Sequence, residues 1–145
     1  MIKRKIVLSV ILVMVLLLAL TGCSTRKNFE IDFEIGIDYA EEYYDDFSDQ
    51  DYEKCVSLFH ESLVEVLGGE DTLFEIYDNM ETEWGTLTDF EVHQAGFKSK
   101  DGETYVLLEI DVTYSTGMTA TDAVTVWVLK DGTASIVWIF TRNPQ

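Results

Sequence analysis

The side chains of this chain that are best suited to chemistry are its two histidines, several strand carboxylates and a pair of adjacent tyrosines. General acid–base chemistry needs a carboxyl or imidazole group whose pKa is shifted by its surroundings, and a tyrosine hydroxyl can hydrogen-bond to such a group. The candidates are His60, His93, Glu109, Asp111, Asp122, Tyr43 and Tyr44. The sequence contains no nucleophile elbow, phosphate loop or dinucleotide fingerprint around them. The chain therefore offers reactive groups without a catalytic motif.

We expect these groups to form a ligand pocket rather than a catalytic site. The predicted pocket residues are Tyr43, Tyr44, His93, Glu109 and Asp111. Glu109 and Asp111 alternate with apolar residues along one expected strand, which leaves two interpretations. They lie either on a solvent-exposed face or in a pocket where desolvation would raise their pKa. The solvent face is favoured unless the pocket lies on their side of the sheet.

Metal-binding patterns are absent from the sequence. Asp49, Asp51 and Glu53 have the spacing that begins an EF-hand loop. However, Lys54 stands where that loop needs glycine, and His60 stands where it needs a bidentate glutamate. Two histidines without a C-x-x-C pair do not make a zinc site either. We therefore predict no metal site and no cofactor.

Charge is distributed very unevenly along the 145 residues. The formal net charge is −17, but residues 1–22 contain three basic residues and no acid. The remaining 123 residues carry seven Lys or Arg against 27 Asp or Glu, a net charge of −20. Nucleic-acid binding needs a basic surface, so this function is excluded. An aromatic content of 12% argues for a folded domain rather than an acidic disordered tail.

The amino terminus has the three parts of an export signal. Basic residues at positions 3–5 precede an apolar run, Ile6 to Leu20, which is short for a membrane span. Leu20-Thr21-Gly22-Cys23 follows and resembles the lipobox of bacterial lipoproteins. The resemblance implies cleavage before Cys23, acylation of its thiol and a lipid anchor on the extracytoplasmic face of the cell membrane. The alternative is an uncleaved amino-terminal membrane anchor with an incidental cysteine.

The second cysteine has no partner once Cys23 is lipidated. Cys55 lies in a helical apolar pattern beside Val56 and Phe59, where a free cysteine usually serves as a small core residue. The functional alternative is a reactive thiol or an intermolecular disulfide.

Helical periodicity dominates the first half of the exported part. The spacing of apolar residues predicts a helix over residues 35–47 and a second over residues 52–59, with one or two further turns over residues 63–67. A third helix is expected from residue 71 or 72 to Trp84, ended by Gly85.

Alternation of polar and apolar residues dominates the second half. Four strands are predicted, over residues 89–98, 105–115, 122–130 and 134–142. Asp-Gly turns at positions 101–102 and 131–132 make neighbouring strands antiparallel. The last strand is apolar on both faces, and simple alternation places Ile136, Trp138 and Phe140 on one face and Val137 and Ile139 on the other.

Helices followed by a long antiparallel meander resemble the layout of NTF2-like domains of the cystatin-fold superfamily. The local features that carry the resemblance are the helix break Phe47–Tyr52, the linker Leu67–Glu70 and the helix-to-sheet junction Trp84–Val92. The resemblance implies an α+β fold in which a curved four-stranded sheet wraps the helices into a cone with a pocket. Some members of this family are ketosteroid-isomerase-like or cyclase-like enzymes, whereas many are binding modules that dimerise through the sheet.

The sequence thus predicts three segments. Residues 1–22 are a signal peptide, residues 23–34 a lipidated cysteine with its tether, and residues 35–145 an NTF2-like domain. The preferred function is the binding of a small apolar ligand or an envelope protein without catalysis. The alternatives are an isomerase- or cyclase-like enzyme that uses a pocket acid and a tyrosine, and a homodimer assembled through the sheet.

Overall fold

A computed structural model describes residues 30–142 and 144–145 of the chain. The chain divides into two compact units, Met1–Ile31 and Asp32–Gln145, and the fold described below is that of the second unit. The predicted signal peptide, Cys23 and most of the tether lie outside the described residues. None of the described helices is long and apolar enough to cross a membrane.

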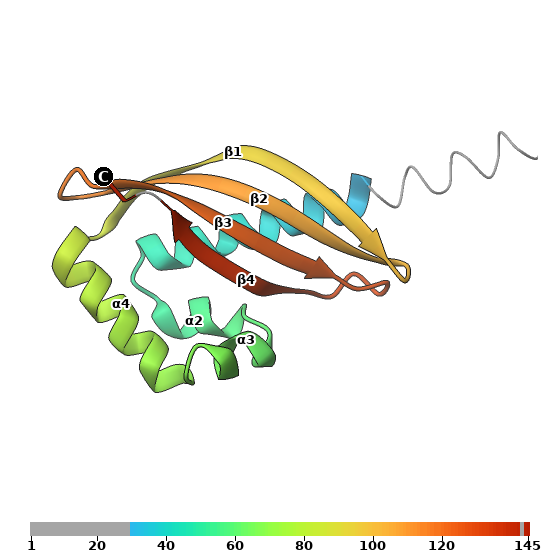
Figure 1. The fold of residues 1–145 in the computed structure, drawn as a ribbon, viewed down its shortest axis with the longest axis horizontal. Coiled ribbons are helices and arrows are strands. Elements are labelled where there is room, and N and C mark those ends of the chain that lie inside the picture. The colour runs from blue at the N-terminus through green and yellow to red at the C-terminus, as the bar shows by residue number, and fades with distance from the viewer. Residues whose placement is uncertain (1–29, 143) are drawn as a thin grey trace, which may run out of the picture. The chain divides into compact units, whose positions relative to one another are not determined.

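The second unit is an α+β fold in which helices cover one face of a four-stranded sheet (Figure 1). The strands pair in the order β1-β2-β3-β4, and every neighbouring pair is antiparallel. The predicted fold class, helices packed on a curved antiparallel meander, is therefore confirmed.

The first helix, described over residues 30–48, lies along the inner face of the sheet (Figure 1). Its buried residues Ala40, Tyr43, Tyr44 and Phe47 recur every three or four positions, so one stripe of the helix faces the core. Gly36 allows the helix to approach the sheet closely, because a Cβ atom there would lie 2.5 Å from the side chain of Val106.

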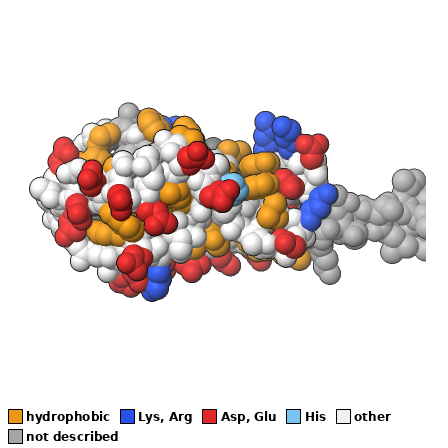
Figure 2. Space-filling view, turned by 90° about the horizontal axis from the view of Figure 1, so that it is seen from below, with side chains coloured by type: hydrophobic (Ala, Val, Ile, Leu, Met, Phe, Trp, Pro, Cys, Tyr) orange, Lys and Arg blue, Asp and Glu red, His pale blue; other side chains and the backbone are white. Residues whose placement is uncertain are grey.

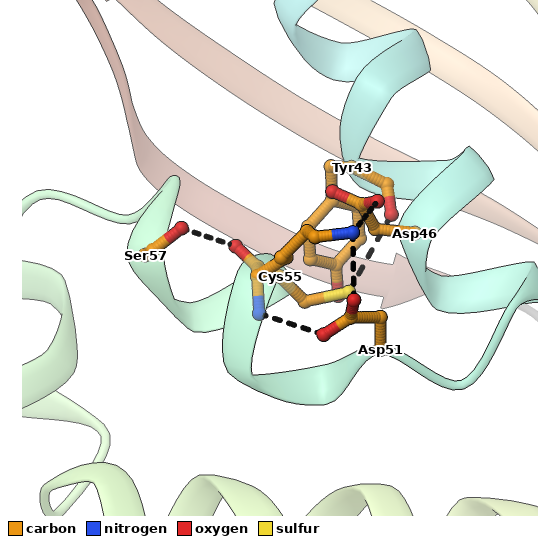
Figure 3. Close-up of polar contacts among 6 residues, drawn as sticks. Tyr43, Asp46, Asp51, Cys55 and Ser57 are labelled. Atoms are coloured by element: carbon orange, nitrogen blue, oxygen red, sulfur yellow. Dashed lines mark hydrogen bonds and ion pairs between the residues drawn. The ribbon is translucent and has the colours of Figure 1, made fainter.

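The helix α2 (Tyr52–Ser57) begins at a capping side chain. Asp51 accepts a hydrogen bond from the backbone N–H of Lys54 and lies 2.7 Å from the ammonium group of the same residue (Figure 3). One turn further on, the thiol of Cys55 points to the first helix, with its Sγ 3.6 Å from the carbonyl oxygen of Tyr43. Cys55 is fully buried, which confirms that it is a core residue, and this burial raises the pKa of its thiol to about 12.

The chain does not continue α2 into a longer helix as the sequence suggested. Instead α3 (Glu61–Val66) is separate, and α4 (Glu70–Trp84) follows it. The break arises because the backbone of residues 58–60 forms a parallel bridge with Ile136 of the last strand. Leu58 accepts from the N–H of Ile136 and His60 donates to its carbonyl, each at 2.9 Å. These long-range hydrogen bonds replace the local ones that a continuous helix would need.

The strands are longer than the predicted ones, except for the last, whose predicted bounds are confirmed. They are β1 (Leu87–Lys100), β2 (Glu103–Tyr114), β3 (Thr119–Val128) and β4 (Ala134–Arg142). Both Asp-Gly turns lie where the sequence placed them, with Gly102 and Gly132 at positive φ. The central strands alternate strictly between buried and more exposed positions, which gives the sheet one inner and one outer face.

The expected alternation in β4 is wrong. Val126 pairs with Ile136, but the preceding residue Thr125 pairs with Trp138, so one residue of β4 is bulged out. The extra residue moves the side chains that follow it to the face opposite to the one that simple alternation predicts. Ile136 is therefore buried, whereas Trp138 and Phe140 lie exposed on the outer face.

Candidate functional site

A cavity of about 160 Å³ lies between the helices and the inner face of the sheet. The first helix, residue Phe59 after α2, residue Leu67 after α3, the helix α4 and three of the strands all contribute to its wall. Its lining residues are mostly apolar or aromatic: Tyr43, Tyr44, Phe47, Phe59, Leu67, Leu73, Ile76, Tyr77, Met80, Tyr114, Asp122, Ile139, Phe140 and Thr141.

One acidic residue, Asp122 of β3, belongs to this wall. Its side chain is only 4% exposed. The hydroxyl group of Tyr44 donates a hydrogen bond to Oδ2 at 2.7 Å, whereas Oδ1 is buried and accepts no hydrogen bond within the described structure. A buried polar atom without a partner is costly, so Oδ1 is the feature of the cavity that most requires an explanation.

The carboxyl group of Asp122 titrates at higher pH than an ordinary aspartate. Loss of hydration raises its pKa, and hydrogen bonding from Tyr44 together with the nearby Thr141 hydroxyl opposes this rise without cancelling it. Thr141, the cross-strand neighbour of Asp122, favours the ionised form without reaching hydrogen-bond geometry at Oδ1. The site therefore holds an acid that can exchange a proton when its surroundings change.

The tyrosines around the cavity remain neutral. The hydroxyl groups of Tyr43 and Tyr77 lie 3.3 Å apart in a shared hydrogen bond. Burial raises the pKa of both residues, and it does the same for Tyr44 and Tyr114. These phenols can donate or accept hydrogen bonds but do not add charge, which leaves Asp122 as the ionisable group of functional interest in the wall.

The five predicted pocket residues lie in two different places. Tyr43 and Tyr44 line the cavity. His93, Glu109 and Asp111 do not; Glu109 forms an ion pair with Arg142, and the imidazole Nδ1 of His93 lies 3.5 Å from a carboxylate oxygen of Asp111. These three residues belong to the outer face of the sheet, the solvent side that the sequence favoured for the two acids.

The sequence contained a signal for Asp122 that the predicted pocket did not use. Along β3, Asp122 has the same parity as the buried residues Ala120, Val124 and Val126 and therefore points inward with them. Glu109 of β2 has the opposite parity to its buried neighbours. Each acid can be compared with the apolar residues at alternate positions of its own strand. This comparison would have assigned Asp122 to the inner face and Glu109 and Asp111 to the outer face.

Comparison of the chain with protein-family models and with curated proteins finds no match. The geometry of the site therefore has to indicate the function by itself. Within the described part of the chain, histidine, cysteine and acidic side chains do not cluster in a group of three that could hold a metal ion.

The outer face of the sheet carries a second, shallower hollow. It is lined by Gln94, Gly96, Leu107, Leu108, Glu109, Ala123, Val124, Thr125 and Arg142. Exposed apolar side chains lie on the same face, with Leu107 47%, Trp138 53% and Phe140 55% exposed. The register places Leu107, Thr125 and Trp138 in one row across three strands. This outer patch, defined as Leu107, Trp138 and Phe140, is a candidate contact surface.

Proposed function

We propose that this protein is an exported, lipid-anchored binding protein whose cavity holds a small, largely apolar ligand without transforming it. The observation that carries the proposal is the cavity itself, in which Asp122 supplies a buried oxygen without a hydrogen-bond partner. An apolar wall with few polar groups is typical of small-molecule sites, where the polar groups fix the orientation of the ligand.

The size of the cavity limits the ligand. A cavity of about 150 Å³ accommodates a benzene molecule in a protein core, and the present cavity measures about 160 Å³. A ligand about the size of one aromatic ring therefore fits without rearrangement. A four-ring substrate would require the helices to move away from the sheet.

Native mass spectrometry of the full-length protein, released gently from its membrane, tests this function. We expect an added mass of one small molecule on most of the protein, because the apolar wall retains it during purification. A protein that carries no added mass, and that binds no ring-sized compound supplied in excess, would contradict the proposal.

A second candidate function is an enzyme that uses a pocket acid and a tyrosine. The hydrogen bond between Tyr44 and Asp122 inside the cavity favours it, since a buried carboxyl with a raised pKa is suited to proton transfer. Incubating the protein with its co-purified ligand separates the two functions. An unchanged ligand supports binding alone, and a product whose formation stops in Asp122→Asn supports catalysis.

Attachment to the membrane depends on Cys23, which lies outside the described residues. We expect Cys23→Ser to release the protein from the membrane fraction, because the thiol can no longer carry the diacylglyceryl group and firm anchoring needs more than one acyl chain. Mass spectrometry of the wild type should show cleavage before Cys23 and the mass of the acyl groups. A wild-type protein that retains residues 1–22 would instead indicate an uncleaved anchor.

For the protein partner we propose a second copy of this chain, docked through the outer patch. Two acids of this face lie beside basic side chains, Glu109 in an ion pair with Arg142 and Asp111 3.5 Å from the imidazole of His93, which reduces the repulsion between two copies there. The projecting Trp138 also lies near a hollow lined by small residues such as Gly96 and Ala123. An isologous dimer could use both features twice.

The substitution Trp138→Glu tests this interface. We expect the wild-type protein to sediment as a dimer at micromolar concentration and the variant as a monomer, because a buried carboxylate without a partner opposes association. Val66→Glu is the matched control, since Val66 is 75% exposed on α3, away from the outer face of the sheet. A wild-type protein that stays monomeric at all concentrations would leave another envelope protein as the partner of this face.

A further inference from the structure

We propose that the ligand of the cavity is a small organic cation, with an ammonium group on an apolar body about the size of one aromatic ring. This inference rests on the proposed function, because it names the class of molecule that the same cavity binds. Two features of the wall support it, namely the aromatic side chains and the unpartnered oxygen of Asp122.

Aromatic side chains make up much of the wall. Six of its fourteen lining residues have buried aromatic rings: Tyr43, Tyr44, Phe47, Phe59, Tyr77 and Tyr114. The ring of Phe140, in contrast, belongs to the outer face of the sheet. Their positions are fixed by contacts with one another. The ring of Tyr43, for example, stacks on Phe59 with centroids 5.5 Å apart and meets Tyr44 edge to face at 5.0 Å. Aromatic ring faces attract cations, and groups of such rings are typical of sites for ammonium ligands.

The carboxyl group of Asp122 is the second feature that would bind the ammonium group of the ligand. Tyr44 already occupies Oδ2 of Asp122, and Oδ1 is buried without a donor. An ammonium N–H is the donor that would satisfy this oxygen, and its charge would neutralise the buried carboxylate. The wall contains no Lys, Arg or His side chain that could take this role. The cavity thus lacks one positive charge, which the ligand would bring.

The charge of the whole molecule favours the same class of ligand. Acidic side chains are scattered over the face of the molecule seen in Figure 2, between patches of apolar surface. A protein whose residues 23–145 carry a net charge of −20 raises the local concentration of cations and repels anions. A neutral ligand that accepts a hydrogen bond from protonated Asp122 would gain nothing from this field.

Binding of a cation should favour the ionised form of Asp122. The groups that face this carboxyl are Tyr44 from the first helix, Tyr77 from α4 through the shared cavity, Tyr114 from β2 and Thr141 from β4. None of them carries a positive charge, and Arg142 pairs with Glu109 on the outer face. The affinity for a cation should therefore increase as the pH rises through the elevated pKa of Asp122, where the ionised form becomes available.

Three probes of matched size test the inference: benzylammonium, benzyl alcohol and benzoate. They would be titrated by calorimetry into the full-length protein in a neutral detergent, with detergent alone as the blank. We expect benzylammonium to bind at least about tenfold more tightly than benzyl alcohol, since a charge-assisted hydrogen bond adds to the ring contacts. Benzoate should not bind. The preference for benzylammonium should shrink as the pH is lowered.

Three substitutions test whether the preference belongs to the cavity. Asp122→Asn should lower the affinity for benzylammonium about tenfold and change the affinity for benzyl alcohol less than about threefold. The substitution removes the charge of the side chain and keeps its shape. Asp111→Asn is the matched control on the outer face and should change neither affinity. Tyr44→Phe, which retains the ring and the carboxylate, should preserve the preference for the cation.

Each other outcome overturns the inference in a recognisable way. Equal affinity for benzylammonium and benzyl alcohol would retain the proposed binding function and reject the cation. Tighter binding of benzoate would also reject it. If none of the three probes binds, both the inference and a ring-sized cavity site are contradicted. A preference for benzylammonium that survives in Asp122→Asn would place the cation elsewhere on this acidic protein.

Discussion

Leu108→Ala should lower the free energy of unfolding by about 2–5 kcal/mol. Leu108 is 2% exposed in the centre of β2 and points into the core that the helices cover. Removing its side chain loses buried apolar surface and leaves a void that the rigid sheet cannot close completely.

The neighbouring residue provides a matched control. Leu107 is the same residue type in the same strand but points to the outer face, where it is 47% exposed. In the monomeric Trp138→Glu background, where the outer patch stabilises no dimer, Leu107→Ala should therefore cost less than about 1 kcal/mol. Urea denaturation of both variants gives the comparison. Equal losses would mean that both faces of β2 are buried, contrary to the described sheet.

Asp122→Asn should stabilise the protein by about 1–3 kcal/mol at neutral pH, because the native state no longer buries a charge with one oxygen unpaired. The pKa of Asp122 is raised in the folded protein above its ordinary value of 3.8, chiefly by loss of hydration. Below pH 4 or so, aspartate is protonated in both states, and its ionisation contributes no difference. As the pH rises through the elevated pKa, the unfolded state ionises more readily and the wild type loses stability relative to the variant.

Thermal or urea unfolding of both proteins from pH 3 to pH 8 measures this difference. The many other carboxyl groups affect both proteins alike, so only the gap between the two curves reports on Asp122. We expect this gap to widen with increasing pH. A gap that closes as the pH rises would mean that the folded protein favours the ionised carboxylate.

Much of the fold could be predicted because it is encoded locally. The alternation from Val106 to Tyr114 defines β2. The two Asp-Gly pairs define the turn between β1 and β2 and the turn between β3 and β4. The bulge in β4 and the break between α2 and α3 could not be predicted in the same way. Both depend on how β4 meets β3 and residues 58–60, and these contacts arise only when distant segments pair.

The residues of the candidate site also differ in whether local sequence or long-range contacts determine them. Tyr43 and Tyr44 were expected in a pocket as hydrogen-bonding partners of an acid, and they line the cavity. The partner of Tyr44 could not be read from spacing, since Asp122 lies 78 residues further along the chain. The alternation in β3 already indicated that Asp122 points inward. The sequence could not show that Oδ1 lacks a hydrogen-bond partner, because this depends on which hydroxyl groups the folded helices and strands bring near it.

A crystal structure of the full-length protein, purified from the membrane of the cell that makes it, tests the central claim most directly. We predict density for one small molecule inside the cavity, with a polar atom within hydrogen-bond distance of Oδ1 of Asp122. A cavity closed by its own side chains, with Oδ1 bonded to a protein group, would contradict this account. Density bound only at the outer face of the sheet would contradict it as well.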